Sequence, residues 1–307
     1  MKKVLLTWAN GMLAHDFLKY CNNDFEIIGM DKEQMDITSL EQVHNVIQQV
    51  QPDIILNCAA YTNVDEAENT DKLINFQVNA LGVYHLAKVA KEEECDLITI
   101  STDYVFDGAL CRHSERSEES SSIQGYLPTD PCNPINAYGM AKYLGEQLVK
   151  SELPSAIIVR TSRLYGGWPA FKNFPNTMLK LAETKNELQI INDQFGLPTF
   201  TKDLALALKI VIEQIEQRRG NIFHFSNSWE KTISWFDFAQ EIFKLKEKKI
   251  RLSPCSSSEF PTRATRPQFS GLANESGIQL RDWKEGLKEY LENLFTFLSY
   301  YHGKTYS

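Results

Sequence analysis

The sequence has few cysteines and no spacing typical of metal ligands. Its 307 residues contain six cysteines, scattered so that no Cys-x-x-Cys pair occurs, and six isolated histidines. Paired cysteines at fixed spacing would indicate a disulfide framework or a zinc site. The sequence therefore indicates no metal, and its unpaired cysteines favour a reducing compartment.

An excess of positive charge and a long apolar run are also missing. Lys and Arg number 32 against 40 Asp and Glu, which gives a formal net charge of -8. This balance argues against a general nucleic-acid surface. No apolar stretch approaches the ~20 residues that a membrane helix needs, and the chain begins directly with an apolar strand rather than a signal peptide. We expect a cytoplasmic protein that binds neither nucleic acid nor membrane.

Glycine is scarce at the turn where a dinucleotide would be bound. Glycines let the backbone approach a pyrophosphate at the N-terminus of the helix that follows the first strand. A full fingerprint would have small residues at 8, 11 and 14, whereas the sequence has Trp8, Gly11 and Ala14. Asp31, at the end of the second strand, could bind a ribose hydroxyl, and Lys32 could instead attract a 2′-phosphate. NADH and NADPH therefore both remain open.

Short apolar runs alternate with helical patterns through the first half of the chain. The expected strands cover residues 3–7, 25–30, 53–57, 96–100 and 156–160. Such alternation predicts an α/β fold of the Rossmann type, a doubly wound parallel sheet with helices on both faces.

The alternation weakens after residue 166, which suggests a domain boundary. We expect a dinucleotide-binding domain at 1–166 and a smaller α+β substrate-binding domain at 167–307, with residues about 188–217 as candidates to return to the first domain. Residues 112–122 are polar, serine-rich and without periodicity. This composition is typical of a surface insertion, and a lid over the site is the alternative.

A tyrosine and a lysine four residues apart share one face of a helix. The lysine charge would favour the phenolate and lower the tyrosine pKa from its usual ~10. Three pairs have this spacing: Tyr84/Lys88, Tyr138/Lys142 and Tyr300/Lys304. Only Tyr138/Lys142 begins a helix after a strand that ends in hydroxyl and carboxylate side chains. We predict that this pair is catalytic, with the Thr102 hydroxyl polarising a substrate carbonyl.

Ordered sequence blocks along nearly the whole chain resemble a known family. The blocks are 57–68 (NCAAYTNVDEAE), 101–108 (STDYVFDG), 136–142 (NAYGMAK), 160–162 (RTS), 192–199 (NDQFGLPT) and 266–270 (RPQFS). They resemble the extended short-chain dehydrogenase/reductases, and within that family the branch that reduces dTDP-4-dehydrorhamnose.

The resemblance implies hydride transfer from NADPH or NADH to the 4-keto group of a nucleotide-linked 6-deoxysugar, with dTDP-4-dehydro-L-rhamnose as the leading substrate. By this resemblance Tyr138 would donate the proton, Lys142 would hold the nicotinamide ribose, and Thr102 would bind the carbonyl. Cofactor contacts would come from Gly11, Met12, Leu13, Asp31, Asp36, Ile37, Ala59, Ala60, Tyr61, Tyr138 and Lys142. Substrate contacts would come from Thr102, Asp103, Tyr104 and Arg163.

Two residues depart from the family pattern and keep alternatives open. Trp8 replaces the first glycine of the turn, which favours a non-catalytic, dinucleotide-binding regulatory relative such as the regulatory subunit of methionine adenosyltransferase. Arg163 replaces a tryptophan that touches the sugar. It could bind a phosphate or a more acidic sugar, as in the same chemistry on another nucleotide sugar, or be a solvated loop charge. The resemblance also allows a homodimer and Mg²⁺, which no ligand cluster in the sequence indicates.

Overall fold

The computed structural model describes residues 1–109, 125–228 and 230–302, and for 295–302 the backbone alone. The predicted insertion at 112–122 lies outside the described residues, as does the Tyr300/Lys304 pair at the level of side chains.

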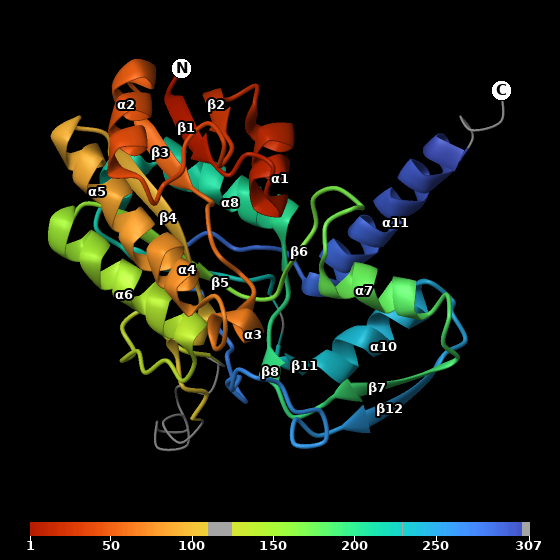
Figure 1. Ribbon diagram of the computed structural model, residues 1–307. Helices are drawn as coiled ribbons and strands as arrows, with labels where there is room; N and C mark the ends of the chain where they lie inside the picture. The colour runs from red at the N-terminus through yellow and green to blue at the C-terminus, as the bar shows by residue number, and fades with distance from the viewer. Residues whose placement is uncertain (110–124, 229, 303–307) are drawn as a thin grey trace.

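A six-stranded parallel sheet forms the larger part of the molecule (Figure 1). Its strand order is β10-β5-β4-β3-β1-β2, and every neighbouring pair runs parallel. The strands are β1 (Lys3–Thr7), β2 (Glu26–Met30), β3 (Ile54–Asn57), β4 (Asp96–Thr102), β5 (Ile157–Thr161) and β10 (Ile222–Phe225). The expected Rossmann-type fold is confirmed.

Alternate side chains of each strand enter cores on opposite faces of the sheet. Val4 and Leu6 of β1 pack on one face and Leu5 on the other, as the period of two along a strand requires. Helices α1 (Met12–Cys21) and α8 (Thr201–Glu213) cover the first face, and α2 (Leu40–Val50), α5 (Val83–Glu92) and α6 (Ala137–Glu152) cover the second. Each fully buried Leu or Ile stabilises this arrangement by about 1.5–3 kcal/mol.

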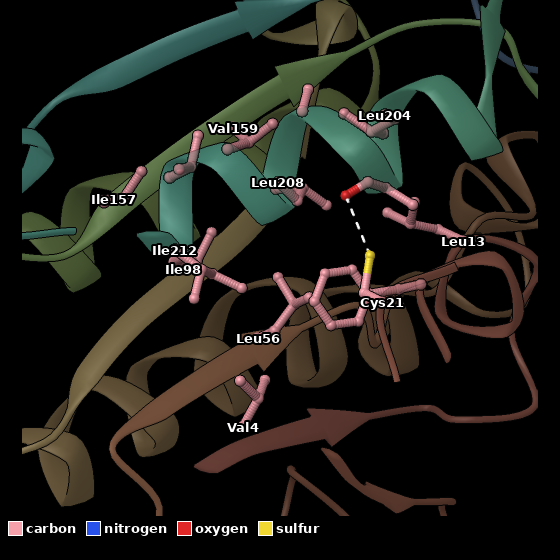
Figure 2. Packing of buried hydrophobic residues seen from close by; sticks show 14 of the residues in the cluster. Val4, Leu13, Cys21, Leu56, Ile98, Ile157, Val159, Leu204, Leu208 and Ile212 are labelled. Atoms are coloured by element: carbon pink, nitrogen blue, oxygen red, sulfur yellow. Dashed lines mark hydrogen bonds between the residues drawn. The ribbon is translucent and has the colours of Figure 1, made fainter. Parts of the chain in front are cut away.

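Helix α8 returns from beyond residue 166 to complete the sheet domain. In Figure 2 its Leu204, Leu208 and Ile212 lie with the strand residues Ile98 and Val159 in one buried cluster. The chain then enters β10, which pairs with β5, although the sequence placed residues 222–225 in the second domain. Because a parallel neighbour needs a crossover helix, α8 and β10 form one unit with β5. The exact domain division stays a prediction.

The remaining C-terminal elements build a smaller part beside the strand ends (Figure 1). Here β7 (Glu187–Ile191) pairs parallel with β12 (Arg251–Cys255), a strand that the sequence did not predict. The helices are α7 (Phe174–Leu181), α10 (Trp235–Leu245) and α11 (Trp283–His302). Ser234 and Asp237 form a capping box that begins α10, and the fully buried Trp283 lies in the core of this part.

The remaining elements are short. They are α3 (Val64–Ala67), α4 (Lys72–Phe76), the π-helix η1 (Gln77–Gly82), the 3₁₀-helix η2 (Asp103–Val105), β6 (Leu164–Tyr165), β8 (Phe195–Gly196), β9 (Thr199–Phe200), α9 (Ile215–Arg218) and β11 (Ile233–Ser234). Across 1–109, 125–228 and 230–302, no helix combines the length and the apolar composition of a membrane span.

Candidate functional site

The predicted catalytic residues come from the end of β4 and the start of α6. At the strand end the Thr102 hydroxyl accepts a hydrogen bond from the Tyr104 backbone N–H at 3.2 Å and donates to Asp103 Oδ1 at 3.1 Å. Asn136 caps α6, because its side chain accepts from the Gly139 N–H at 2.8 Å. An N-cap of this kind satisfies a backbone donor that has no partner inside the helix. The cap therefore fixes where the helix that carries Tyr138 begins.

Gly139 allows α6 to approach the backbone of η2 closely. A Cβ atom at this position would lie 2.1 Å from the carbonyl oxygen of Tyr104. Without that side chain the first turn of the helix packs directly on η2. As a result Tyr138 and Tyr104 meet edge to face, with ring centroids 6.0 Å apart and planes at 81°, and the Tyr138 hydroxyl lies within interaction range of the Thr102 hydroxyl. The structure brings Thr102 and Tyr138 together as predicted.

Lys142 lies one turn along α6 from Tyr138 and is 4% exposed. Its Nζ donates to the carbonyl oxygen of Ile100 at 2.6 Å. Burial lowers the pKa of this ammonium to about 8, while the nearby Glu146 acts in the opposite direction. Lysine therefore stays protonated at neutral pH but close to its titration range.

The pKa of Tyr138 is raised, whereas the sequence analysis expected Lys142 to lower it. Burial is the largest cause, and the charge of Asp103 adds to it. The hydrogen bond with Thr102 acts in the opposite direction. The physical reason is that burial removes more hydration energy from the phenolate than the interaction with Thr102 restores. Tyr138 therefore remains a neutral phenol at ordinary pH.

A buried ion pair that the sequence analysis did not identify lies beneath Lys142. Glu146, one helical turn further along α6, accepts hydrogen bonds from Nε and from a terminal nitrogen of Arg160 at 2.9 and 2.7 Å. Ser101 donates to the same carboxylate at 2.5 Å. The signal was the spacing of Lys142 and Glu146 on one helix face, read together with the Arg160 block.

The three predicted catalytic side chains open into one cavity of about 590 Å³. It also takes in the β1–α1 turn, Arg163 and Trp235. Of the predicted binding residues, its wall includes Gly11, Met12, Leu13, Ala60, Asp103, Tyr104 and Arg163. A cavity of this size fits a small organic ligand with convergent polar groups.

A second cavity of about 260 Å³ adjoins the first. Trp8, Ala60 and Thr62 line both cavities. The predicted cofactor residues that line the second are Asp36, Ile37, Ala59, Ala60 and Tyr61. Together the two cavities make an elongated cleft along the carboxyl ends of β1, β3 and β4, where open α/β sheets bind their ligands.

Asp31 lines neither of these two cavities, although the sequence predicted a cofactor contact there. Its carboxylate accepts hydrogen bonds from the Asn10 backbone N–H, at 2.8 Å, and from the Asn10 side chain. The neighbouring Lys32 does line the second cavity. Of Asp31 and Lys32, it is therefore Lys32 that lies in the wall of this cavity, which also includes Asp36.

The loop after β3 is held by a residue that the sequence analysis did not identify. Asn79 lies in the π-helix η1, and its side chain accepts from the Tyr61 N–H at 3.1 Å and donates to the Tyr61 carbonyl at 2.8 Å. π-helical turns often occur at functional sites, but no local sequence pattern marks them. Asn79 fixes the backbone of the predicted cofactor loop 59–61.

Trp8 adopts a left-handed backbone conformation, with φ 56°, in the turn before α1. Its carbonyl accepts a hydrogen bond from the Gly11 N–H at 2.8 Å. A Cβ atom on Gly11 would lie 2.7 Å from the indole Cδ1, so the ring lies over the glycine. Since the indole is 38% exposed and borders both cavities, it forms a wall between them and fills neither.

The N-terminus of α1 faces the cleft with free backbone donors. Gly11 is the N-cap and has no side chain to accept from the first helical N–H groups. Such a terminus binds phosphate oxygens through its N–H groups and the helix dipole. The donor set and the two adjoining cavities therefore fit a dinucleotide.

Arg163 is held inside the cavity wall and is not a solvated loop charge. Its guanidinium lies 4.1 Å from the centre of the Trp235 ring. The two terminal nitrogens donate to the carbonyls of Ile233 and Gln194, both at 2.9 Å. Burial lowers the pKa of Arg163 to about 10, against the opposing charges of Tyr104 and Asp103. These contacts leave Arg163 poorly placed to clamp a phosphate.

Asp103 has a buried carboxyl group near the Tyr138 phenol. It is 3% exposed, and burial raises its pKa to about 6. The Ser270 hydroxyl and the Arg163 charge oppose this shift. Asp103 therefore lies in the cavity wall next to Thr102. In the parts of the chain that the structure describes, no three His, Cys, Asp or Glu side chains gather to hold a metal ion.

The chain is similar along nearly its whole length to known proteins. A family model described as the RmlD substrate binding domain matches residues 1–296. The spore coat polysaccharide biosynthesis protein SpsK of Bacillus subtilis (strain 168) is 37% identical over 298 residues, which cover 95% of this chain and 98% of that protein.

Two solved structures share the fold over the same extent. The crystal structure of a dTDP-4-dehydrorhamnose reductase from Clostridium acetobutylicum ATCC 824 has a TM-score of 0.85 and 38% identity, and the match covers 95% of this chain and 99% of that one. A dTDP-4-dehydrorhamnose reductase from Bacillus anthracis str. Ames, in complex with NADP, has a TM-score of 0.84 and 34% identity, with coverage of 95% and 99%.

Proposed function

The chain belongs to the RmlD substrate binding domain family, and we propose that it reduces dTDP-4-dehydro-L-rhamnose to dTDP-L-rhamnose. It is an NADPH-dependent oxidoreductase that acts on the 4-keto group of a nucleotide sugar. The observation that carries the assignment to this site is the meeting of Thr102, Tyr138 and Lys142 in one cavity that continues toward the N-terminus of α1.

The chain's own residues hold and move a proton at the substrate oxygen. Bound NADPH would supply the hydride for the carbonyl carbon. Tyr138 is the proton donor, because its raised pKa keeps the phenol protonated until negative charge develops on the oxygen. The Thr102 hydroxyl lies beside it and would donate to the same oxygen. Lys142, protonated below its pKa of about 8, lines the same cavity as both of these residues.

We assign the cofactor contacts to the N-terminus of α1 and to the second cavity. Gly11, Met12 and Leu13 would bind the pyrophosphate at the N-terminus of α1, and Asp36 and Ile37 would border the adenosine in the second cavity. Asp31 would act through Asn10, which it holds in the turn. Lys32 in the cavity wall favours the 2′-phosphate of NADPH over NADH.

Asp103, Tyr104 and Arg163 form the substrate side of the first cavity. We propose that Asp103 accepts from a sugar hydroxyl and that Arg163 supports the Trp235 ring as an apolar surface. The non-catalytic alternative rested on Trp8. Both functions need space for a dinucleotide, so it is the meeting of Thr102, Tyr138 and Lys142 in the first cavity that favours the reductase.

NADPH is expected to raise the melting temperature of the purified protein. A ligand that binds only the folded state at about 100 times its Kd stabilises it by about 2.7 kcal/mol, which corresponds to a shift of several degrees. Scanning fluorimetry with NADPH and NADH measures the shift, and Lys32→Ala should narrow the difference between the two. The absence of a shift at millimolar cofactor would count against the reductase.

Trp8→Gly is expected to tighten NADPH binding. Glycine removes the ring beside the phosphate turn, which gives the pyrophosphate more room. It also relieves the left-handed backbone, which costs a non-glycine residue about 1–2 kcal/mol of folding stability. Calorimetric titration with NADPH measures the affinity. Trp8→Ala is the matched control, since it removes the indole and keeps the strained backbone. Weaker binding by both variants would show instead that the turn uses the indole to hold the dinucleotide.

We further propose a cytoplasmic location and a homodimer. The described cysteines Cys21, Cys58, Cys95, Cys132 and Cys255 are free thiols, as a reducing compartment favours.

Exposed apolar side chains on the neighbouring α4, η1 and α6 offer a contact surface for the homodimer: Leu73, Ile74, Leu81, Met140 and Leu144. Sedimentation would measure the oligomeric state.

A further inference from the structure

The loop 263–270, from the C-terminal part of the chain, contacts α3 of the sheet domain through two arginines. Arg266 donates from its two terminal nitrogens to the two oxygens of Asp65, at 3.1 and 2.8 Å. Arg263 donates to Glu66 at 2.6 Å. The two pairs differ in exposure, because the Arg266 side chain is 18% exposed and that of Arg263 is 57% exposed. A bidentate pair fixes the plane of the guanidinium as well as its position.

The Arg266 guanidinium also lies within interaction range of the Tyr104 hydroxyl and can donate a hydrogen bond to it. Burial raises the pKa of Tyr104 to about 12, and Arg266 opposes that shift. Tyr104 lines the first cavity, here called the catalytic cavity, and its ring lies edge to face with that of Tyr138. Arg266 does not line that cavity, so it is not itself placed to contact a ligand there. The chain of contacts runs from Asp65 through Arg266 to Tyr104.

The loop 263–270 also contacts Asp103, the residue before Tyr104. Ser270, 3% exposed, interacts with the Asp103 carboxylate. The loop is itself tied to α6, because Asn136 donates to the Thr265 carbonyl at 2.9 Å. The loop and the start of the catalytic helix therefore hold the substrate side of the cavity between them.

We propose that Arg266, oriented by Asp65, is a positioning residue that holds the Tyr104 phenol in place for the sugar. This inference rests on the proposed function. Arg266 acts through Tyr104 and not on the substrate itself. A charged hydrogen bond of this kind is worth about 10- to 100-fold in kcat/KM when it orients a substrate contact. The loss should appear mainly in KM, since the Thr102, Tyr138 and Lys142 contacts are unchanged.

The test is a double-mutant cycle of Arg266→Gln and Tyr104→Phe. If Arg266 acts through the phenol, each variant lowers kcat/KM about 10- to 100-fold and the double variant is no worse than either. Arg263→Gln is the matched control, because it breaks the other ion pair of the same loop and leaves Tyr104 untouched. Its kinetics should equal those of the wild type, and all variants should keep the NADPH-induced thermal shift.

Additive losses in the cycle would overturn the proposal, as would an equal loss in Arg263→Gln. Arg266→Lys, which keeps the charge but not the bidentate fork, replaces Arg266→Gln if that variant does not fold. If the wild type does not reduce the sugar nucleotide, the proposed function fails. The same variants are then compared by urea unfolding. Additive changes in the unfolding midpoints would overturn the link between Arg266 and Tyr104, and non-additive changes would support it.

Discussion

Tyr138→Phe is expected to lower turnover by about 10²- to 10⁴-fold, the range typical of a lost general acid, while NADPH affinity is retained. The substitution removes one oxygen atom and keeps the ring that packs edge to face on Tyr104. Stability should therefore change little. Steady-state kinetics with the dTDP-linked 4-keto sugar measure the loss, and the thermal shift with NADPH measures the retained binding.

Tyr84→Phe is the matched control for this prediction. Tyr84 and Lys88 have the same spacing as Tyr138 and Lys142, but they lie on α5, outside the catalytic cavity. This control should keep wild-type turnover. Turnover retained by Tyr138→Phe would remove Tyr138 from its role as proton donor and leave Thr102 or water to supply the proton.

The sheet could be predicted from sequence because its signal is local. The strands at residues 3–7 and 54–57 contain the apolar runs 4–6 and 54–56, and such runs between helical patterns occur in buried parallel strands. The choice of Tyr138 over Tyr84 and Tyr300 rested on the polar strand end before α6, which is also local. The structure places Thr102, Tyr138 and Lys142 at one cavity, as this context predicted.

Contacts between segments distant in sequence could not be predicted. Arg163 was interpreted from its place in the family pattern, whereas its environment is set by Trp235 and by two carbonyls from segments distant in sequence. The raised pKa of Tyr138 depends on burial, which the spacing of Tyr138 and Lys142 does not encode. The pairing of residues 251–255 with β7 also joins segments far apart in the chain, and no turn signal marks it.

Gly139→Ala is expected to reduce both stability and turnover. The added Cβ would lie 2.1 Å from the Tyr104 carbonyl oxygen, so α6 must move away from η2. Overpacking of this kind costs about 1–3 kcal/mol. A displacement of about 1 Å between catalytic groups lowers turnover about 10²-fold, because Tyr138 and Lys142 would move with the helix while Thr102 stays with β4. Urea unfolding and kcat measure the two effects.

Gly145→Ala separates the two effects, because it makes a similar overlap at another point on the same helix. Its Cβ would lie 2.3 Å from the Asn79 carbonyl oxygen in the π-helix η1. A comparable loss of stability is therefore expected, with a smaller loss of kcat, since the contact between α6 and η2 is kept. Equal losses of kcat in both variants would mean that general loosening of α6 lowers turnover. A larger loss in Gly139→Ala would show that the close approach of α6 to Tyr104 sets the distance between the phenol and the Thr102 hydroxyl.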